Sequence, residues 1–258
     1  MKPYLSVILT THNRPQYLER AIKSLLSQEY QNYEILLIAD ESSIGTKYVA
    51  ANLLRPMDSF ISIPGMRGPS ESRNLGIQLA KGEWISFLDD DDAYENDYFD
   101  NAVKVLTRSK QVNYFNFKKI IECRSGLNPS CLSEKKVDLS LRQIDDLWIS
   151  NFIPNNALFI FSALARGHLI NNRLSSHEDW DWLINLSESY EFIHHDIYGP
   201  LVYSDENSSR NERAYKNSSV VLDYLSIYRR WPAKNIDIKN KRSELLASMG
   251  LNLRSDFL

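Results

Sequence analysis

What the sequence lacks excludes several classes of protein. No apolar stretch approaches the roughly 18 residues that a membrane-spanning helix needs, and the start, Met1 to Tyr4, has no charged-then-apolar signal pattern. Internal repeats and low-complexity linkers are also missing. We therefore expect a cytoplasmic globular protein. Its 258 residues, 43% of them hydrophobic, suffice for one large domain or two small ones that share a core.

Neither sign of charge dominates the composition. Lys and Arg number 30 and Asp and Glu number 33, which gives a formal net charge of −3. Proteins that bind nucleic acid usually present a basic surface, so we expect no nucleic-acid partner. An anionic ligand would have to be held by local groups.

Cysteine is almost absent. Cys123 and Cys131 lie eight positions apart in a segment rich in Ser, Asn and Lys. Two cysteines cannot form a tetrahedral zinc site by themselves, and a lone pair in a chain without a secretion signal is usually reduced. We expect free thiols, with a disulfide across a hairpin as the alternative.

The most informative feature that is present is a run of four carboxylates, Asp89 to Asp92, directly after the apolar segment Trp84 to Leu88. Neighbouring carboxylates raise each other's proton affinity unless a cation neutralises them, and Mg²⁺ and Mn²⁺ prefer oxygen ligands. The alternative is a solvated acidic turn that caps the next helix. We favour a metal site, because the strand would direct the acids to one end of a sheet.

Apolar strand-like and helix-like segments alternate through the first half of the chain. Asn13 can cap the first helix, with Pro15 in its first turn, and Gly82 can close the third helix as a left-handed cap. Such alternation predicts a mostly parallel sheet with right-handed crossovers and helices on both faces. The expected strands cover about residues 5–9, 34–38, 59–63 and 84–88, and the helices about 15–26, 46–54 and 71–80.

The second half shows a weaker pattern. A helix with Phe99, Val103 and Leu106 as its apolar stripe leads into a strand at 112–117, and residues 118–147 read as irregular. The later elements expected are a helix from about residue 178, a strand at 192–195 and a helical tail from residue 218.

Polar residues follow three of the expected strands. They are Thr10 to Asn13, Asp40 to Ser42, and Asp89 to Asp92. In open α/β sheets, ligands bind beyond the carboxyl ends of the strands. The coincidence of three polar strand ends predicts a ligand site there.

Several segments together resemble the family-2 glycosyltransferases of the Rossmann-like GT-A fold. The resemblance is continuous over about residues 4–100 and sparser to about 210, and it implies a single GT-A catalytic domain at 1–210. Within it, 1–118 would bind the nucleotide sugar and 119–210 the acceptor, before a C-terminal helical tail at 211–258. The matching segments are 6–14, 24–28, 33–42, 72–76, 81–83 and 87–94.

The resemblance implies a nucleotide-sugar donor, a divalent ion, Mn²⁺ or Mg²⁺, and transfer with inversion at the anomeric carbon. The family's base-binding positions match Thr10, His12 and Asp40, and a carboxylate that accepts from an imide N–H suits uracil. This chain departs from the family pattern at His12, which replaces the more common Tyr, and at Ala39 and Glu41 around the acid.

The family's D-x-D element falls on Asp89, Asp90 and Asp91. The resemblance implies that Asp91 and Asp89 bind the metal and nucleotide, and that Asp90 approaches the ribose. Arg73 lies in the stretch that faces the diphosphate, and its guanidinium fork suits phosphate oxygens; the alternative is a surface arginine near a helix start.

The segment His177 to Trp182 resembles the family's Glu-Asp motif, in which Asp179 occupies the position of the catalytic base. A carboxylate there would take the proton of the acceptor hydroxyl. The alternatives are an N-cap cluster on a surface helix and, less favoured, a zinc motif, since no second histidine follows at helical spacing.

Two later segments allow alternative interpretations. Residues 203–210 match a mobile loop of the family, in which Arg210 would contact the diphosphate, and they also fit an ordinary exposed loop. Residues 229–254 hold seven Lys or Arg with interspersed apolar positions. This composition suits contact with the inner face of an anionic membrane, but we favour a terminal helix packed on the catalytic domain.

The sequence thus predicts an inverting glycosyltransferase that uses a nucleoside diphosphate sugar, favouring UDP. The resemblance implies a glycan or lipid-linked glycan acceptor in cell-surface polysaccharide or lipopolysaccharide synthesis. A sugar nucleotidyltransferase would want a glycine-rich loop where this chain has Thr10 to Asn13. A non-catalytic nucleotide- or carbohydrate-binding protein would be favoured if the acids or the base were lost.

Overall fold

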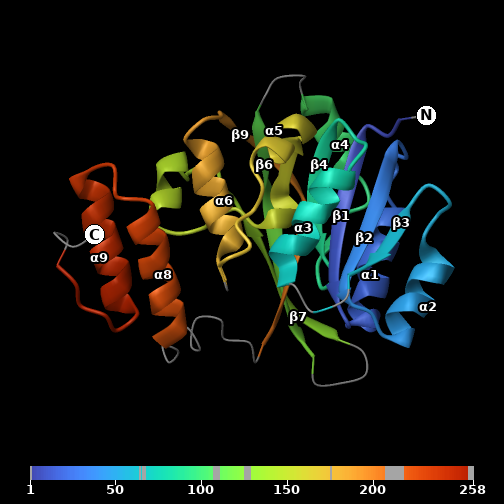
Figure 1. Cartoon of the computed structure of the whole chain (residues 1–258), viewed down its shortest axis with the longest axis horizontal. Helices are drawn as coiled ribbons and strands as arrows, with labels where there is room; N and C mark the ends of the chain where they lie inside the picture. The colour runs from blue at the N-terminus through green and yellow to red at the C-terminus, as the bar shows by residue number, and fades with distance from the viewer. Residues whose placement is uncertain are drawn as a thin grey trace.

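A single curled sheet runs through the molecule (Figure 1). The computed structural model describes residues 2–63, 65, 68–106, 111–124, 129–174, 176–206 and 218–254. Within these residues nine strands form the sheet, in the order β3-β2-β1-β4-β8-β6-β9-β5, with β7 paired to β6 beside that path. The α/β architecture expected from the sequence is confirmed.

The first half of the chain builds the parallel part of the sheet. The pairs β1–β2, β1–β4 and β2–β3 are all parallel, so the carboxyl ends of these strands meet at one edge. The elements are β1 (Leu5–His12), α1 (Pro15–Leu26), β2 (Tyr33–Glu41), α2 (Ile44–Leu53), β3 (Ser59–Ser62), α3 (Gly68–Leu79) and β4 (Trp84–Asp89).

The second half makes the sheet mixed. The pairs β4–β8, β6–β8, β6–β7 and β5–β9 are antiparallel, whereas β6–β9 is parallel. The elements are β5 (Ala93–Tyr94), α4 (Tyr98–Val105), β6 (Val112–Cys123), β7 (Ser130–Val137), η1 (Ile144–Trp148), η2 (Asn155–Ala157), β8 (Leu158–Phe161), α5 (Ser162–Gly167), α6 (Glu178–Ser187), β9 (Phe192–Asp205), α8 (Ser218–Arg230) and α9 (Ile236–Ser248).

Alternate residues of β1 enter different hydrophobic cores. Val7 and Leu9 face the core formed with α1, α2 and α4, whereas Ile8 faces the core that contains α3 and α6. All three side chains are fully buried. Burial on both faces explains why this strand reads as a continuous apolar run.

The C-terminal helices α8 and α9 lie beside α6, away from the parallel strands (Figure 1). Ile227, Ile238 and Leu246 enter the same core as α6. Asp181 of α6 is 2% exposed, accepts a hydrogen bond from Trp231 Nε1 (2.8 Å) and forms an ion pair with Arg230 Nε (2.8 Å). The tail is therefore a packed layer of the fold, and none of the described helices is long and apolar enough to cross a membrane.

The expectation of irregular structure over residues 118–147 is wrong. Strand β6 continues to Cys123, and β7 pairs with it in antiparallel register. Every residue of β7 before Val137 is exposed. A strand that faces water on both sides has no alternation of apolar and polar residues. The Ser, Glu and Lys residues of β7 therefore gave no sequence signal for a strand.

The strand expected at 192–195 is only the beginning of β9, which runs for 14 residues to Asp205. Two register shifts interrupt its pairing with β6, and such bulges break the regular alternation that marks a strand. The loop expected from residue 203 is corrected in the same way as far as Asp205, because residues 203–205 belong to this strand.

Asn13 and Gly82 do not have the cap roles expected of them. Asn13 is left-handed with φ of 52°, and Arg14 takes the N-cap position before Pro15. Helix α3 ends at Leu79, and among the described residues Gly82 is not one of the glycines with positive φ. Gly82 is instead required by space, since a Cβ there would lie 2.6 Å from the backbone nitrogen of Ser6.

No disulfide joins Cys123 and Cys131. In the β6–β7 ladder, Cys131 lies opposite Glu122, and Cys123 lies opposite Ser130. Directly opposed residues share a face of the sheet, so the two thiols point to different faces.

We predict that Gly82→Ala lowers the free energy of unfolding by about 1–3 kcal/mol, the usual cost of overpacking, because backbone of β1 blocks the new methyl group. Gly167→Ala is the matched control, since a Cβ there meets nothing within 4 Å; it should change stability by about 0.5 kcal/mol or less. Urea unfolding measures both. Equal effects of the two substitutions would contradict the packing role of Gly82.

Candidate active site

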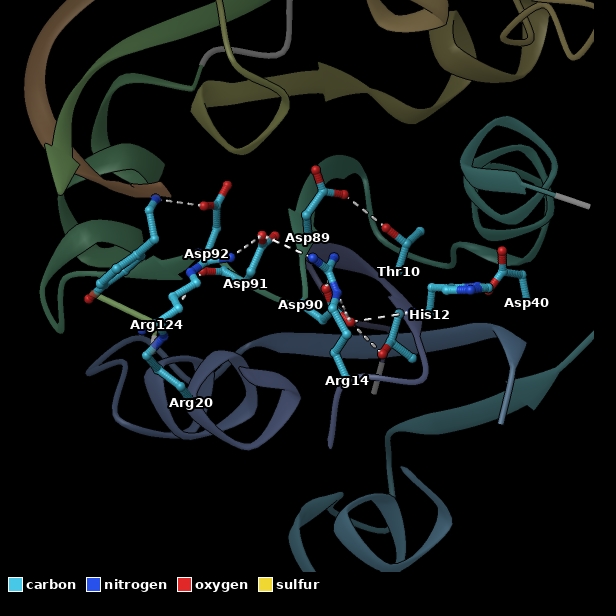
Figure 2. A network of polar contacts seen from close by, with 12 residues as sticks. Thr10, His12, Arg14, Arg20, Asp40, Asp89, Asp90, Asp91, Asp92 and Arg124 are labelled. Carbon is cyan, nitrogen blue, oxygen red and sulfur yellow. Dashed lines mark hydrogen bonds and ion pairs between the residues drawn. The ribbon is translucent and has the colours of Figure 1, made fainter. Parts of the chain in front are cut away.

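The acidic run is fastened to the end of β1. Parallel pairing places Thr10 opposite Asp89, and the Thr10 hydroxyl donates to Asp89 Oδ1 at 2.9 Å. The Thr11 hydroxyl donates to Asp90 Oδ2 at 2.7 Å. Two distant segments of the sequence thus meet where the sheet topology predicts a ligand site (Figure 2).

Asp90 lies beneath the site. Its side chain is fully buried and accepts hydrogen bonds from Thr11, from the backbone N–H of His12 (3.3 Å) and from Arg14 Nε (3.3 Å). Burial raises the pKa of Asp90, against the opposing effect of the Arg14 guanidinium. In this structure the carboxylate is engaged by Thr11, His12 and Arg14, and the ribose contact of Asp90 stays a prediction.

Two guanidinium groups contact Asp91. Arg14 Nη1 lies 3.1 Å and Arg124 Nη1 lies 3.3 Å from Asp91 Oδ2. Arg20 donates to the backbone carbonyl of Asp91 at 2.6 Å. Figure 2 shows the three arginines converging on this residue from α1 and from the end of β6.

Glu122 holds two of these arginines in place. Its carboxylate is buried and accepts from Arg20 Nη1 (2.7 Å) and Arg124 Nε (2.8 Å). Arg20 also lies over the Tyr203 ring, 3.7 Å from its centroid. The hairpin end of β6 is therefore connected to α1 and β9 through charged and aromatic contacts.

Arg73 bridges the two acidic motifs. It donates to Asp89 Oδ1 at 2.9 Å and to Glu178 Oε1 at 2.8 Å, and it is 5% exposed. Burial alone would raise the pKa of Asp89, but the Arg73 guanidinium and hydrogen bonds from Arg73 and Thr10 hold it below its ordinary value. Arg73 is therefore not a surface arginine, and carboxylates engage both of its terminal nitrogens; its contact with a diphosphate stays a prediction.

His12 and Asp40 form a pair at the ends of β1 and β2. His12 Nδ1 lies 2.7 Å from Asp40 Oδ1, and the His12 side chain is half exposed. A register shift after Thr11 sets His12 opposite Glu41, whose carboxylate is 3.6 Å from Nε2. An open imidazole beside a carboxylate could contact a planar base.

Asp179 lies in the first turn of α6, across a cavity from the acidic run. The cavity has a volume of about 870 Å³, and Asp89, Asp91 and Asp179 all line it. Asn151 Nδ2 donates to Asp179 Oδ2 at 3.2 Å. Burial and the neighbouring Glu178 carboxylate raise the pKa of Asp179, which suits a group that must accept a proton.

Apolar and aromatic side chains also line the cavity. They come from β6, the end of β7, the segment that leads to η2, and β9. Lys119 and Arg142 are the cationic residues of the lining. The apolar and aromatic lining residues are Phe117, Ile121, Val137, Leu139, Phe152, Ile153, Val202 and Tyr203.

The donor atoms at the acidic run fit a hard divalent ion that also binds substrate oxygens. Among the described residues, Asp89 Oδ2 and Asp91 Oδ1 accept no hydrogen bond, and each residue lines the cavity. No group of three or more His, Cys, Asp or Glu side chains able to hold a metal occurs in the described part of the chain. One or two carboxylates plus phosphates is the usual donor set of Mg²⁺.

Sequence reasoning missed Arg20, Glu122 and Arg124 and assigned no role to Arg14. Arg14 carried a signal, because it follows a polar strand end directly. The other three come together only because β6 extends beyond its apolar part and pairs with β9. Arg210, the other expected diphosphate contact, lies outside the described residues.

Comparisons with known proteins place this architecture among sugar transferases. The family model for glycosyl transferase family 2 matches residues 6–167. The GalNAc(5)-diNAcBac-PP-undecaprenol beta-1,3-glucosyltransferase of Campylobacter jejuni is 35% identical over 242 residues, which cover 87% of this chain and 73% of that protein. The putative colanic acid biosynthesis glycosyl transferase WcaA of Escherichia coli is 29% identical over 73% of this chain and 67% of its own.

Solved structures share the fold. Staphylococcus aureus TarS 1-349 in complex with UDP-GlcNAc matches with a TM-score of 0.64 and 18% identity, covering 96% of this chain and 72% of that one. The mannosyltransferase PcManGT from Pyrobaculum calidifontis, in complex with GDP-Man and Mn²⁺, matches with a TM-score of 0.63 and 14% identity, covering 99% and 78%.

We predict that Arg73→Gln lowers the free energy of unfolding by about 3–5 kcal/mol at neutral pH, because it leaves the buried Glu178 carboxylate and the partly buried Asp89 carboxylate without their cation. The folded pKa of Asp89 is lowered, so this stabilisation exists above the carboxyl's unfolded pKa of about 4 and is lost as the pH falls through the folded pKa. The difference between wild type and variant should therefore shrink in acid.

Denaturant unfolding between pH 7 and pH 3 checks the prediction. Arg142→Gln is the control, since Arg142 is half exposed and 3.8 Å from Asp146; such pairs contribute about 0–1 kcal/mol. A small loss at neutral pH, or a loss that does not depend on pH, would show that the Arg73 bridge is not a stabilising ion pair.

Proposed function

The chain belongs to glycosyl transferase family 2, and on this basis we propose that it moves one sugar, with inversion, from a nucleoside diphosphate to an acceptor hydroxyl. It is a glycosyltransferase of polysaccharide or glycan biosynthesis. UDP is the favoured nucleotide. We also propose the division into a catalytic domain at 1–210, with its donor half at 1–118 and acceptor half at 119–210, and a tail at 211–258.

One observation carries the proposal. Asp89 and Asp91, from the end of β4, share a cavity with Asp179, from the start of α6. A transferase that inverts configuration needs donor-binding groups on one side of the anomeric carbon and a base on the other. A nucleotidyltransferase or a binding protein would have no need of a proton-accepting carboxylate at this place.

Asp179 would act as the general base. As the acceptor oxygen forms its bond to the anomeric carbon, the bond from that carbon to the diphosphate oxygen breaks, and the hydroxyl proton passes to the Asp179 carboxylate. Its raised pKa increases its proton affinity. Asn151 and the backbone N–H of Trp180 hold the two carboxylate oxygens (3.2 Å and 2.7 Å).

Asp91 and Asp89 would hold Mn²⁺ or Mg²⁺ through their open oxygens. Such an ion, when bound, neutralises the charge that develops on the departing diphosphate. The structural relative PcManGT contains Mn²⁺ together with GDP-Man, which supports a divalent ion here.

His12 and Asp40 would bind the base of the nucleotide. Asp40 Oδ1 is engaged by His12, and the second oxygen would accept the imide N–H of uracil while the imidazole lies against the ring. Thr10 would contact the nucleotide from the same strand end. The structural relative TarS was solved with UDP-GlcNAc, which supports a uridine donor. Arg210 is kept as a proposed diphosphate contact.

A glycan or lipid-linked glycan is the proposed acceptor. Phe117, Phe152 and Tyr203 give the cavity an aromatic wall that suits the apolar face of a sugar ring. The relative from Campylobacter jejuni is named for a substrate linked to undecaprenol, and this supports a lipid-linked acceptor. The exposed basic residues between 229 and 254, which do not include the buried Arg242, would then contact the membrane surface.

We predict that UDP binds tightly only with a divalent ion and that this dependence requires Asp91, since diphosphate and carboxylate otherwise repel each other. UDP is titrated calorimetrically into wild type and Asp91→Ala, with and without Mn²⁺. Asp40→Ala is the comparison: it should weaken UDP and leave the affinity for Mn²⁺ unchanged. Equal UDP affinity of wild type and Asp91→Ala in both conditions would remove the metal assignment.

We predict that Asp179→Asn lowers turnover by about 10² to 10⁴-fold, the usual contribution of a general base, and retains affinity for the nucleotide sugar. The base works only when ionised, so wild-type kcat/KM should rise with pH through a pKa above that of an ordinary Asp, and the variant should lose this rise. Nucleoside diphosphate released from a panel of nucleotide sugars provides the assay.

Other outcomes reassign the role of this segment. Near-normal transfer by Asp179→Asn would point to Glu178 or Asp181 as the base. Loss of nucleotide-sugar affinity would mean that the start of α6 belongs to the donor site or to the fold.

A further inference from the structure

The carboxylate proposed to receive the metal is already occupied by cations of the protein. Asp91 Oδ2 lies 3.1 Å from Arg14 Nη1 and 3.3 Å from Arg124 Nη1. Both guanidinium groups reach the same oxygen (Figure 2). A divalent ion at Asp91 would therefore stand next to two positive groups, and like charges this close repel strongly in a partly buried site.

The ion-paired groups that surround the acidic run nearly balance one another in charge without any ligand. Among the described residues, the ion-paired carboxylates of the site number one more than the arginines that bind them. A divalent ion by itself would make this group positive, whereas an ion that arrives with a diphosphate would not. The carboxylates are Asp89, Asp90, Asp91, Glu122 and Glu178, and the arginines are Arg14, Arg20, Arg73 and Arg124.

Arg124 has an unused donor. Glu122 anchors its Nε at 2.8 Å, the Tyr17 ring lies 4.7 Å from its guanidinium carbon, and Nη1 contacts Asp91. Nη2 is buried and has no hydrogen-bond partner among the residues that the structure describes. A buried N–H without an acceptor is costly, and a phosphate oxygen would provide one. The fixed Nε would keep the guanidinium close to Asp91 after Nη1 leaves it.

Arg14 has freedom that Arg73 lacks. The Arg14 side chain is 41% exposed, and its guanidinium spans Asp90 and Asp91. Arg73 is buried, and both of its terminal nitrogens bind carboxylates. Among the described arginines, Arg14 and Arg124 are the two that contact the Asp91 carboxylate, and each has a second carboxylate partner, Asp90 for Arg14 and Glu122 for Arg124.

We propose that Arg14 and Arg124 exchange Asp91 for the donor diphosphate when a divalent ion reaches Asp91. The inference rests on the proposed function and names the groups that bind the diphosphate. The guanidinium fork suits phosphate as well as carboxylate. The two arginines then compete with a free cation for Asp91, but they stabilise a cation that is bound together with the nucleotide diphosphate. Cation and nucleotide therefore bind cooperatively.

The variant Arg124→Gln distinguishes this exchange from the alternative in which Arg124 only orients the Asp91 carboxylate. Exchange predicts shifts of opposite sign: Mn²⁺ alone should bind about 10-fold more tightly, because a competitor is removed, and UDP with Mn²⁺ about 10-fold more weakly, because a charge-assisted contact is lost. An orienting residue would weaken both. Electron paramagnetic resonance of free Mn²⁺ and calorimetry of UDP measure the two affinities.

Lys23→Gln is the matched control. Like Arg124→Gln, it removes one positive charge, but from α1, where Lys23 is exposed and paired only with Glu19 among the described contacts. The affinities for Mn²⁺ and for UDP should both stay unchanged. Thermal melting reports whether each variant is folded.

The wild type gives a test that needs no variant. Binding linkage is reciprocal, so UDP should tighten Mn²⁺ by the same factor, about 10-fold or more, by which Mn²⁺ tightens UDP. Independent binding of the two ligands would overturn the exchange, as would an Arg124→Gln protein whose UDP affinity is unchanged or whose Mn²⁺ affinity falls. Failure of the proposed function would give a different result: the wild-type protein with Mn²⁺ would bind neither UDP nor GDP.

Discussion

The buried guanidinium of Arg73 is the contact on which the rest of the site depends. It joins Asp89, at the end of the parallel half of the sheet, to Glu178, at the start of the helix that carries Asp179. Without it, the carboxylates of the two segments would repel each other. The ion pair therefore holds the acids proposed to bind the donor close to the helix that carries the proposed base.

The mixed half of the sheet supplies what the parallel half cannot. Strand β8 runs antiparallel to β4 and brings β6 and β9 alongside the acidic run. These strands wall the cavity and place Arg124 against Asp91. The C-terminal segment helps to fix the position of α6, because Trp231 and Arg230 bind Asp181, which lies two residues after the proposed base.

Elements buried on one or both faces could be predicted from the sequence, and elements defined by remote contacts could not. Strands β1, β2 and β4 and helix α1 have apolar residues at the spacing that their burial requires. Strand β7 is exposed, so nothing in its composition distinguishes it from a loop. Gly82 had the right residue type for a helix cap, but the close approach of β1 is what requires glycine.

The order of residues along the chain was enough to predict the family and the fold class. It also predicted which carboxylates lie at the ends of strands and helices, because an apolar strand and the acids that follow it are neighbours in the sequence. The contacts of those carboxylates came only from the tertiary structure. It buried Asp90 under Arg14, engaged Arg73 in an ion pair, and brought Arg124 to Asp91. These roles depend on which side chains come into contact across the sheet. The pairing of strands that are distant in the sequence determines those contacts, and no local sequence pattern encodes that pairing.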